Sequence, residues 1–417
     1  MTTETLTIAR LGSGGDGIAE APGGPVYVPF TLPGETVAVA RVKNHGTVMS
    51  MSVVSPERVE PACVHFGPDG KNGTCGGCTL QHAGDALYHD FKRGLVVNAL
   101  KAKGLTPDVA PLVIARPGER RRVTFTARKT EKGILLGFNQ AGSHHIVSIE
   151  HCPISSGGIV SRLDDIRRVC AAIATSSEPF RLTVLETATG LDLAFEGLKK
   201  VGDRERRAVT ECVLSQRGIA RVSNDGEIII EPVKPEIDFD GVRVFPPAGG
   251  FTQATKPAEE AMAGLVLEAL GKAKRVADLF AGSGTFALRI ARRAKVHAVE
   301  GDEKAIKALD HAARNTQGLK PVTVERRDLF RRPLMVSELK AYDAVVFDPP
   351  RAGAEDQCKE LARSGVKTIV AVSCNPVSLA RDLSILTAAG YRIRLVTPID
   401  QFLWSAHVEA VAVLEKQ

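Results

Sequence analysis

The stretch Asp278-Leu-Phe-Ala-Gly-Ser-Gly-Thr285 decides the fold of the C-terminal part of the chain, because an apolar strand runs directly into a glycine-rich loop. Strand-sized apolar runs then recur, and helical segments separate the first five of them. These strands are predicted at residues 275–280, 296–300, 322–326, 344–348, 368–373, 392–396 and 407–414. The alternation predicts a mostly parallel, doubly wound α/β sheet for residues 246–417.

Polar and reactive residues gather at the ends of these predicted strands. They are Asp278, Glu300, Asp328, Asp348, Cys374 and, near the start of the last strand, Glu409. Ligands of open α/β sheets bind beyond the carboxyl ends of the strands. If the last strand runs antiparallel to its neighbours, Glu409 lies at the same edge as the others. We therefore expect one cleft at this edge to hold the chemistry.

The glycine loop has two interpretations. Gly282-x-Gly284-x-x-Ala287 fits the dinucleotide fingerprint, and Glu300 follows at a distance suited to binding a ribose hydroxyl. An NAD-dependent oxidoreductase is therefore a real alternative. The same loop suits the adenosine and methionine parts of S-adenosylmethionine equally well, so the choice depends on the other motifs.

Ser373-Cys374-Asn375-Pro376 places a thiol where a buried strand runs into a turn. A free cysteine is most often a small buried hydrophobe, which is the plain alternative here. On the neighbouring strand, the two prolines of Asp348-Pro-Pro-Arg351 fix a rigid turn and remove two amide donors. Asp348 is then free to face a planar polar ligand, although a purely structural turn stays open. Together the two motifs favour a nucleophilic thiol beside a clamped planar ring.

The first 245 residues have a different organisation. Residues 1–57 contain several short strands with glycine-rich turns, which predict a small OB-type β-barrel that binds an oligonucleotide or serves only as a structural module. Residues 58–245 combine a cysteine-bearing loop, a helix at 86–103 and several hairpins, which predict an α+β domain with an antiparallel sheet. Part of residues 79–122 is expected to pack on the C-terminal domain.

Composition sets broad limits on function. The chain has 417 residues and a net charge of +6, which suits a phosphate-backbone partner but does not prove one. Its apolar runs are too short to span a membrane, and its N-terminus lacks signal-peptide features, so we expect a cytoplasmic protein. Basic residues cluster at 116–129 and 326–332, where they either grip phosphates or form a solvated face.

The eight cysteines are unevenly distributed, and disulfides are not expected in a cytosolic chain. Cys170, Cys212 and Cys358 lie in ordinary segments, where packing explains them. Four others share a region rich in glycine, proline and histidine: Cys63, Cys75, Cys78 and Cys152. Four thiolates suit either zinc or a [4Fe–4S] cluster.

Three motifs carry a family resemblance: Asp-Pro-Pro-Arg at 348–351, Ser-Cys-Asn-Pro at 373–376 and His-Val-Glu at 407–409. With Gly-Gly-Phe-Thr-Gln at 249–253 and the segment 145–154, they make nearly the whole chain resemble the RNA 5-methyluridine methyltransferases. The resemblance implies a Rossmann-like class I methyltransferase domain, a central α+β domain and an N-terminal TRAM barrel. A TRAM barrel with a cysteine cluster is typical of the 23S ribosomal RNA branch, which uses a [4Fe–4S] cluster. We accordingly expect a monomer that acts on 23S rRNA.

The same resemblance implies roles for individual residues. Cys374 is the nucleophile that adds to uracil C6, and Glu409 accepts the proton from C5. The residues implied to line the S-adenosylmethionine site are Gln253, Phe280, Thr285, Glu300, Asp328 and Asp348, with Glu300 on the ribose hydroxyls. The thiol needs a lowered pKa, for which Arg351 or Arg381 is expected to supply positive charge.

Some positions depart from the family pattern. The family usually has Asn where Thr285 stands, and Leu403-Trp404 replaces a Pro-His pair. The spacing between Cys63 and Cys75 is longer than usual, which suggests a loop insertion and leaves zinc as an alternative. The same chemistry on transfer RNA stays open, as do an NAD-dependent oxidoreductase and a non-catalytic RNA-binding factor.

Overall fold

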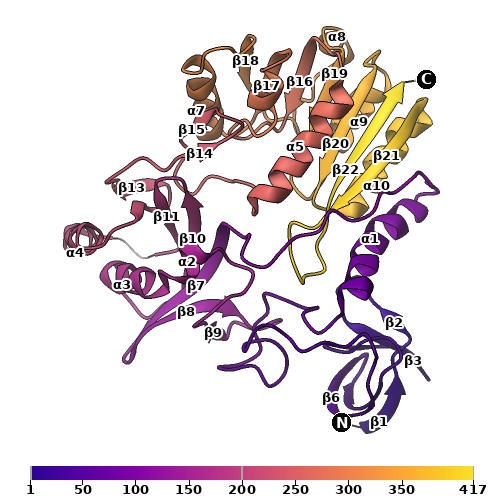
Figure 1. The fold of residues 1–417 in the computed structure, drawn as a ribbon, viewed down its shortest axis with the longest axis vertical. Helices are drawn as coiled ribbons and strands as arrows, with labels where there is room; N and C mark the ends of the chain where they lie inside the picture. The colour runs from indigo at the N-terminus through magenta and orange to yellow at the C-terminus, as the bar shows by residue number, and fades with distance from the viewer. Residues whose placement is uncertain (1, 199–200, 417) are drawn as a thin grey trace.

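The computed structural model describes residues 2–198 and 201–416, and its three main sheets form separate blocks (Figure 1). The N-terminal strands lie at the bottom of that view, the central sheet lies at the left and the C-terminal sheet lies at the top. Each block encloses a hydrophobic core of its own. Within the described residues, no helix combines the length and the hydropathy needed to cross a membrane.

The N-terminal block is a six-stranded sheet in the order β1-β5-β6-β4-β3-β2. Its strands are β1 (Thr2–Thr7), β2 (Arg10–Leu11), β3 (Gly17–Ala21), β4 (Gly24–Val28), β5 (Thr36–Val42) and β6 (His45–Val53). Alternate residues such as Val37 and Val39 point into a small apolar core. Gly17 allows the chain to pass close to Thr31, because a Cβ at this position would lie 2.1 Å from the Thr31 hydroxyl oxygen.

The central block is a seven-stranded sheet in the order β13-β12-β11-β10-β7-β8-β9. Its elements are β7 (Arg122–Thr130), β8 (Gly133–Asn139), β9 (Ile146–Ser148), α2 (Gly157–Val160), α3 (Leu163–Ile173), β10 (Phe180–Thr187), β11 (Gly190–Glu196), α4 (Asp203–Leu214), β12 (Ile219–Asn224) and β13 (Glu227–Ile230). The prediction of an antiparallel sheet is wrong at one place, since β11 and β12 pair in parallel. The helix α4 lies between them in sequence and provides the crossover that a parallel pair requires.

The C-terminal block confirms the predicted doubly wound sheet. Seven strands follow the order β18-β17-β16-β19-β20-β22-β21, and the first five are parallel. The seven strands are β16 (Arg275–Leu279), β17 (Lys295–Glu300), β18 (Val322–Arg326), β19 (Ala344–Phe347), β20 (Thr368–Ser373), β21 (Tyr391–Ile399) and β22 (Glu409–Lys416). The helices are α5 (Lys256–Leu270), α6 (Ala287–Ile290), α7 (Glu303–Arg314), α8 (Val336–Leu339), α9 (Glu355–Ala362) and α10 (Pro376–Ala388), and a short ribbon, β14 (Ile237–Asp238) and β15 (Arg243–Val244), precedes them. Because apolar clusters lie on both sides of the sheet, its strands are almost continuously hydrophobic.

One long helix connects the N-terminal half to this sheet. Helix α1 (Asp85–Lys101) runs along the right-hand side of Figure 1, beside α10 and β21. Its residues Val96 and Leu100 belong to the same apolar core as the strands of the C-terminal sheet. Farther along the chain, Val109 and Val113 form bridges to Val396 and Ile399 of β21. The C-terminal core therefore includes side chains from residues 96–113.

Candidate active site

The candidate active site lies at the edge of the C-terminal sheet where the parallel strands end. Strand β20 ends at Ser373, and the antiparallel pairing of Ser373 with Ala410 brings Cys374 to the level of Glu409. The neighbouring strand β19 ends directly before Asp348. Burial raises the pKa of the Cys374 thiol most, and the charges of Glu409 and Asp348 raise it further. The predicted antiparallel last strand is confirmed.

A chain of amide side chains connects the two carboxyl groups. Gln253 donates its Nε2 to Asp348 Oδ2 at 3.0 Å, and its Oε1 accepts from Gln401 Nε2 at 2.9 Å. Gln401 Nε2 also donates to Glu409 Oε2 at 3.0 Å, and its Oε1 accepts from the backbone N–H of Ala254 at 2.6 Å. All four side-chain positions are thereby fixed relative to one another.

Gln401 is the residue of this network that the sequence did not reveal. It follows β21, whose C-terminal end lies at the same edge because β21 pairs antiparallel with β22. The rule that ligands bind beyond the carboxyl ends of strands covers this position too. The available signal was therefore its position after a strand rather than a motif.

The two carboxyl groups of the network both have raised pKa values. Burial raises the pKa of Asp348, and burial together with the neighbouring Asp348 raises the pKa of Glu409 well above its usual range. Two carboxylates in one buried site resist joint ionisation. A cation placed between them would be attracted and would restore the ionised forms.

The prediction of a lowered thiol pKa is wrong for the protein alone. Burial, Glu409 and Asp348 raise the pKa of Cys374 to about 11, and Arg351 opposes them only in part. Arg351 is held nearby, because Asn375 Nδ2 donates to its backbone oxygen at 3.0 Å. Arg381 instead donates to the Ala352 carbonyl and pairs with its neighbour Asp382, so that it supports the turn after Asp348.

The glycine loop after β16 is held by Glu300. One carboxylate oxygen accepts from Gly282 N–H at 2.9 Å and the other from Asp302 N–H at 2.8 Å. Beneath the loop, within the described part of the chain, both carboxyl oxygens of the fully buried Asp278 lack a hydrogen-bond partner, as does the hydroxyl of Ser283. Such buried polar atoms need partners, so this end of the site fits a ligand that brings a positive charge and donors.

The remaining expected cofactor residues also follow strand ends. Phe280 has a positive φ of 59° and packs its ring 5.4 Å from that of Phe330. Asp328 accepts from the Phe330 N–H at 3.0 Å and stays half-exposed after β18. The half-buried Thr285 lies in the glycine loop, and its carbonyl accepts from Arg289 at 2.7 Å. All three therefore lie on segments that the sheet brings to this edge.

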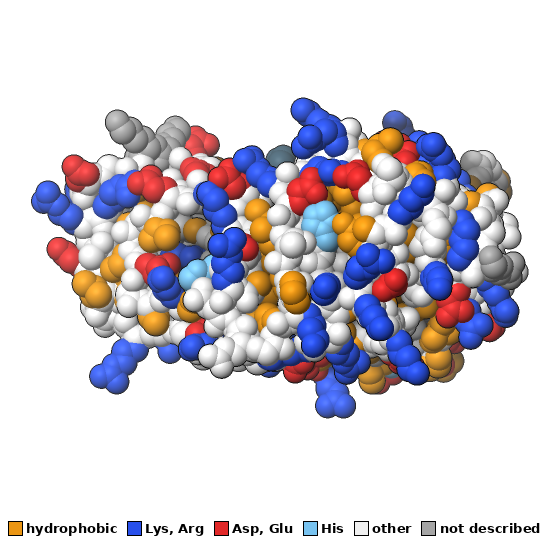
Figure 2. Space-filling model, turned by 90° about the horizontal axis from the view of Figure 1, so that it is seen from above, with side chains coloured by type: hydrophobic (Ala, Val, Ile, Leu, Met, Phe, Trp, Pro, Cys, Tyr) orange, Lys and Arg blue, Asp and Glu red, His pale blue; other side chains and the backbone are white. Residues whose placement is uncertain are grey.

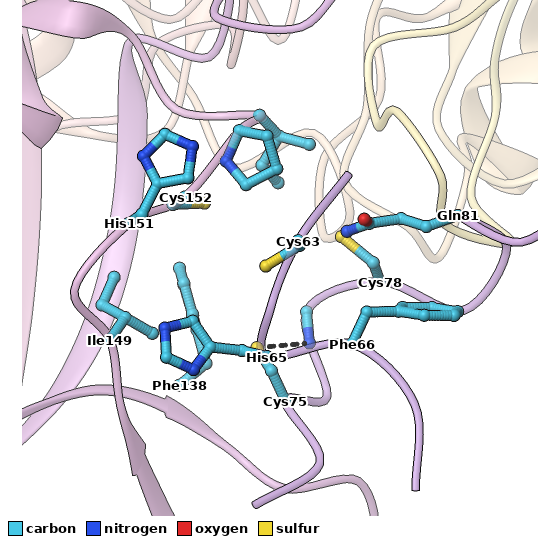
Figure 3. A pocket seen from close by; sticks show the side chains of 13 residues that line it. Cys63, His65, Phe66, Cys75, Cys78, Gln81, Phe138, Ile149, His151 and Cys152 are labelled. Atoms are coloured by element: carbon cyan, nitrogen blue, oxygen red, sulfur yellow. Dashed lines mark hydrogen bonds between the residues drawn. The ribbon is translucent and has the colours of Figure 1, made fainter. Parts of the chain in front are cut away.

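A second group of reactive side chains lies away from this edge. Figure 3 shows a pocket whose lining includes all four cysteines expected as ligands, namely Cys63, Cys75, Cys78 and Cys152. Burial and the neighbouring thiols raise the pKa of Cys75 to about 11 and that of Cys78 to about 12. Among residues 2–198 and 201–416, no group of three or more His, Cys, Asp or Glu side chains is arranged to hold a metal ion.

The predicted basic clusters have different surroundings. In the 326–332 cluster, Arg326 pairs with Glu303, Arg327 with Glu325 and Glu338, and Arg331 with Asp328. Figure 2, which views the molecule from the end formed by the C-terminal sheet, shows basic and acidic side chains interleaved. Arg326 and Arg331 therefore form ion pairs at the surface, whereas Arg327 forms its ion pairs largely buried.

The 120–122 cluster lies next to the site instead. Arg121 donates to the Gln253 carbonyl at 3.3 Å and to the buried Glu259 at 2.6 Å. Arg122 lies over the ring of Phe251, which is 67% exposed. These arginines support the Gln253 loop, and Phe251 beside them offers an aromatic surface to solvent.

Comparison with known proteins agrees with this geometry. The model of the tRNA (uracil-5-)-methyltransferase family matches residues 245–417. A Rhizobium meliloti protein named as an uncharacterized RNA methyltransferase is 73% identical, over 100% of both chains. The 23S rRNA (uracil(1939)-C(5))-methyltransferase RlmD of Hahella chejuensis is 31% identical, over 99% of this chain and 97% of its own.

A solved structure shows the same fold. The tRNA (uracil-54, C5)-methyltransferase of Pyrococcus abyssi, in complex with S-adenosyl-L-homocysteine, superposes with a TM-score of 0.73 at 24% identity, over 98% of this chain and 99% of that chain. The fold is thus that of a class I S-adenosylmethionine-dependent methyltransferase. The chain belongs to the RNA (uracil-5-)methyltransferase family and is an RNA methyltransferase.

Proposed function

We propose that the enzyme methylates C5 of a uridine in 23S ribosomal RNA. The observation that carries the proposal is the placement of Cys374 beside Glu409, with Gln401, Gln253 and Asp348 joined to Glu409 by hydrogen bonds. The relative named for 23S rRNA and the pocket lined by four cysteines favour ribosomal RNA. The family model named for tRNA makes the same chemistry on tRNA the second candidate.

S-adenosylmethionine fits the residues beside the thiol. Its positive charges match the unpartnered Asp278 carboxyl and the two carboxyls whose pKa values are raised, Asp348 and Glu409. When bound, it supplies the methyl group and a sulfonium charge that favours the ionised forms of its neighbours. The residues proposed to hold it are Gln253, Phe280, Thr285, Glu300, Asp328 and Asp348.

The residues of the chain account for the other steps. The Cys374 thiolate adds to uracil C6, and the electron pair of the C5=C6 bond makes C5 nucleophilic enough to accept the methyl group. Glu409 then takes the proton from C5, whose bonding pair re-forms the C5=C6 bond while the C6–S bond breaks. Arg351 stabilises the thiolate form, since it is the group that lowers the pKa of Cys374. The uridine has to leave its base stack to reach this edge.

The four-cysteine pocket is proposed to hold a [4Fe–4S] cluster. Cys63, Cys75, Cys78 and Cys152 line the same pocket although Cys63 is separated by a long loop. A single zinc ion needs four sulfurs at about 2.3 Å from one centre. A [4Fe–4S] cluster takes four cysteine thiolates, and the lining of this pocket supplies four. The cluster would brace the surrounding loops, and methyl transfer needs no electron from it.

The experiment uses labelled S-adenosylmethionine with transcripts of 23S rRNA and of tRNA. We expect label in 23S rRNA, recovered after digestion as 5-methyluridine. Label in tRNA alone would support the second candidate, and label in neither RNA would contradict both. A monomeric state and a cytoplasmic location stay predictions, which sizing and fractionation test directly.

A further inference from the structure

The loop of residues 400–408 connects β21 to β22 and carries Gln401, which holds the carboxyl of the proposed proton acceptor Glu409. Gln401 lies at its beginning, and Glu409 follows its last residue. Gln401 and Glu409 are hydrogen-bonded to each other at 3.0 Å, so the two ends of the loop must stay close together. A loop of this length has to be tied by groups outside it to keep one conformation.

Lys92 of α1 supplies such a tie. Its side chain is fully buried, and its ammonium lies 3.0 Å from Asp400 Oδ1. The same ammonium donates to the Phe402 carbonyl at 3.0 Å and to the His407 carbonyl. An ammonium has three N–H donors, so all of them are used by acceptors of this single loop. Lys92 thus binds acceptors near both ends of the loop and holds these ends together.

Tyr88 lies one turn earlier on the same face of α1 and contacts the same loop. Its hydroxyl donates to Asp400 Oδ2 at 2.6 Å and accepts from Trp404 N–H at 2.7 Å. The backbone N–H groups of Thr79 and Leu80 both donate to the Trp404 carbonyl. The loop is therefore fixed from the N-terminal half of the chain, through residues far away in sequence.

We propose that Lys92 is a positioning residue for the removal of the C5 proton. A buried lysine–aspartate pair carries a large desolvation cost, and an apolar side chain could fill the same space. The charge has a specific effect here, because it gathers three acceptors of the loop that places Gln401 and Glu409. This inference rests on the proposed methyl transfer, and it adds a residue of α1 to those that support the catalytic residues.

The effect of Lys92 is specific to one step. Cys374 lies on a different segment, where Asn375 caps α10 by accepting from the Val377 N–H at 3.1 Å. The nucleophile itself is therefore placed without the 400–408 loop. The loop reaches the residues of the earlier steps only through intermediaries, since Gln401 bonds Gln253 and the His407 ring lies 2.9 Å from Arg351. Loss of the tie disturbs Gln401, which orients the Glu409 carboxyl, while β22 keeps the Glu409 backbone in the sheet. Proton removal should therefore suffer most, so the covalent RNA adduct forms but resolves slowly.

The test compares Lys92→Met with Arg93→Met. Arg93 is the next residue on α1, and its guanidinium donates to the Val109 and Ala110 carbonyls instead. The probes are two preparations of total RNA from a strain that lacks the gene for this enzyme. Total RNA contains both ribosomal and transfer RNA, so either possible substrate is present. One preparation carries tritium at uridine C5, so tritium release reports proton removal. The other carries 5-fluorouridine, so the adduct reports every step before it.

For Lys92→Met we expect tritium release to fall at least about tenfold. Adduct formation on fluorouridine RNA should stay within about threefold of wild type, and adduct should accumulate on ordinary RNA. Arg93→Met should match wild type in both assays. The double variant Lys92→Met/Asp400→Asn removes both charges and avoids an unpaired buried carboxylate, so it gives the same readout if the single variant folds poorly.

Two results would overturn the proposal. One is wild-type tritium release by both the single and the double variant. The other is an equal loss in both assays, which is the signature of a merely structural role. A wild-type enzyme that forms no adduct and releases no tritium would instead refute the proposed methyl transfer itself, so the two failures are distinguishable.

Discussion

The active-site edge and the four-cysteine pocket both gather reactive side chains, but they are held in different ways. At the edge, Gln253 and Gln401 join two carboxyls through hydrogen bonds of 2.9–3.0 Å, on segments that strands of the sheet place. In the pocket, the thiols project from loops, and their sulfurs accept hydrogen bonds from groups such as the Gly77 N–H and the Ser155 hydroxyl. The first site is held by hydrogen bonds between side chains on segments that the sheet places, whereas thiols of the second site are packed among apolar residues of the central core.

Replacing one cysteine at a time distinguishes the roles of the two sites most clearly. We expect Cys374→Ala to lose methyl transfer by about 10⁴-fold or more, because the proposed nucleophile is removed. Cys212→Ser is the matched control, since Cys212 is also partly exposed but lies on α4. Full activity of Cys374→Ala in the labelled-methyl assay would contradict the mechanism.

Substitution of Glu409, the proposed proton acceptor, should give the next largest effect. Glu409→Gln keeps the shape of the side chain but cannot take a proton, so turnover should fall about 10²–10³-fold. The covalent enzyme–RNA complex should accumulate and be visible as a shifted band under denaturing conditions. Loss of turnover without accumulation would place Glu409 outside the last step.

The pH dependence tests the thiol at the edge. Because the pKa of Cys374 is raised to about 11, its thiolate fraction increases about tenfold per pH unit between pH 7 and 9. We therefore expect kcat/KM for RNA to rise with pH over this range. Arg351→Met removes the charge that lowers this pKa, so its profile should move to higher pH and its rate at pH 7.5 should fall severalfold.

The control for this profile is Arg363→Met, because Arg363 is exposed on the last turn of the α9 region and pairs with Glu360. Its pH profile should coincide with that of wild type. A flat wild-type profile from pH 7 to 9 would show that another step or another ionisation limits the reaction.

Substitution of a cysteine in the pocket should lower metal content and stability more than activity, which is the opposite of a substitution at the active-site edge. Anaerobically purified enzyme is expected to be brown and to contain iron, and Cys78→Ser should lose iron and melt at a lower temperature. Its folded fraction should keep methyl transfer within about tenfold of wild type, since the thiols do not contact the reacting atoms. Colourless protein with bound zinc, or with no metal, would refute the iron–sulfur proposal.

Much of the C-terminal fold was predictable, because hydrophobic strands and helices alternate regularly there. The strands at Val322–Arg326 and Thr368–Ser373 have the predicted bounds. The last strand runs antiparallel to its neighbour, as predicted, and this direction brings Glu409 to the edge where β20 ends. The parallel pairing of β11 with β12 was not predictable, since local patterns do not reveal which strand a crossover reaches.

The surroundings of the side chains in the candidate active site were harder to predict from the sequence. An arginine near Cys374 suggested a lowered pKa, but the sequence does not show that burial and two carboxyls outweigh the arginine and raise the pKa of the thiol. Gln401 and Lys92 carry no motif, and their partners lie far away in the chain. A lysine in the middle of a helix usually faces solvent, so its burial becomes visible only in the folded structure.

The most direct test of the account locates the covalent bond. Glu409→Gln enzyme is incubated with 23S rRNA and S-adenosylmethionine, the complex is digested with nuclease and protease, and the peptides are sequenced by mass spectrometry. We predict a methylated uridine remnant attached to the sulfur of Cys374. A remnant on any other residue, or none while wild-type enzyme produces 5-methyluridine, would contradict the assignment.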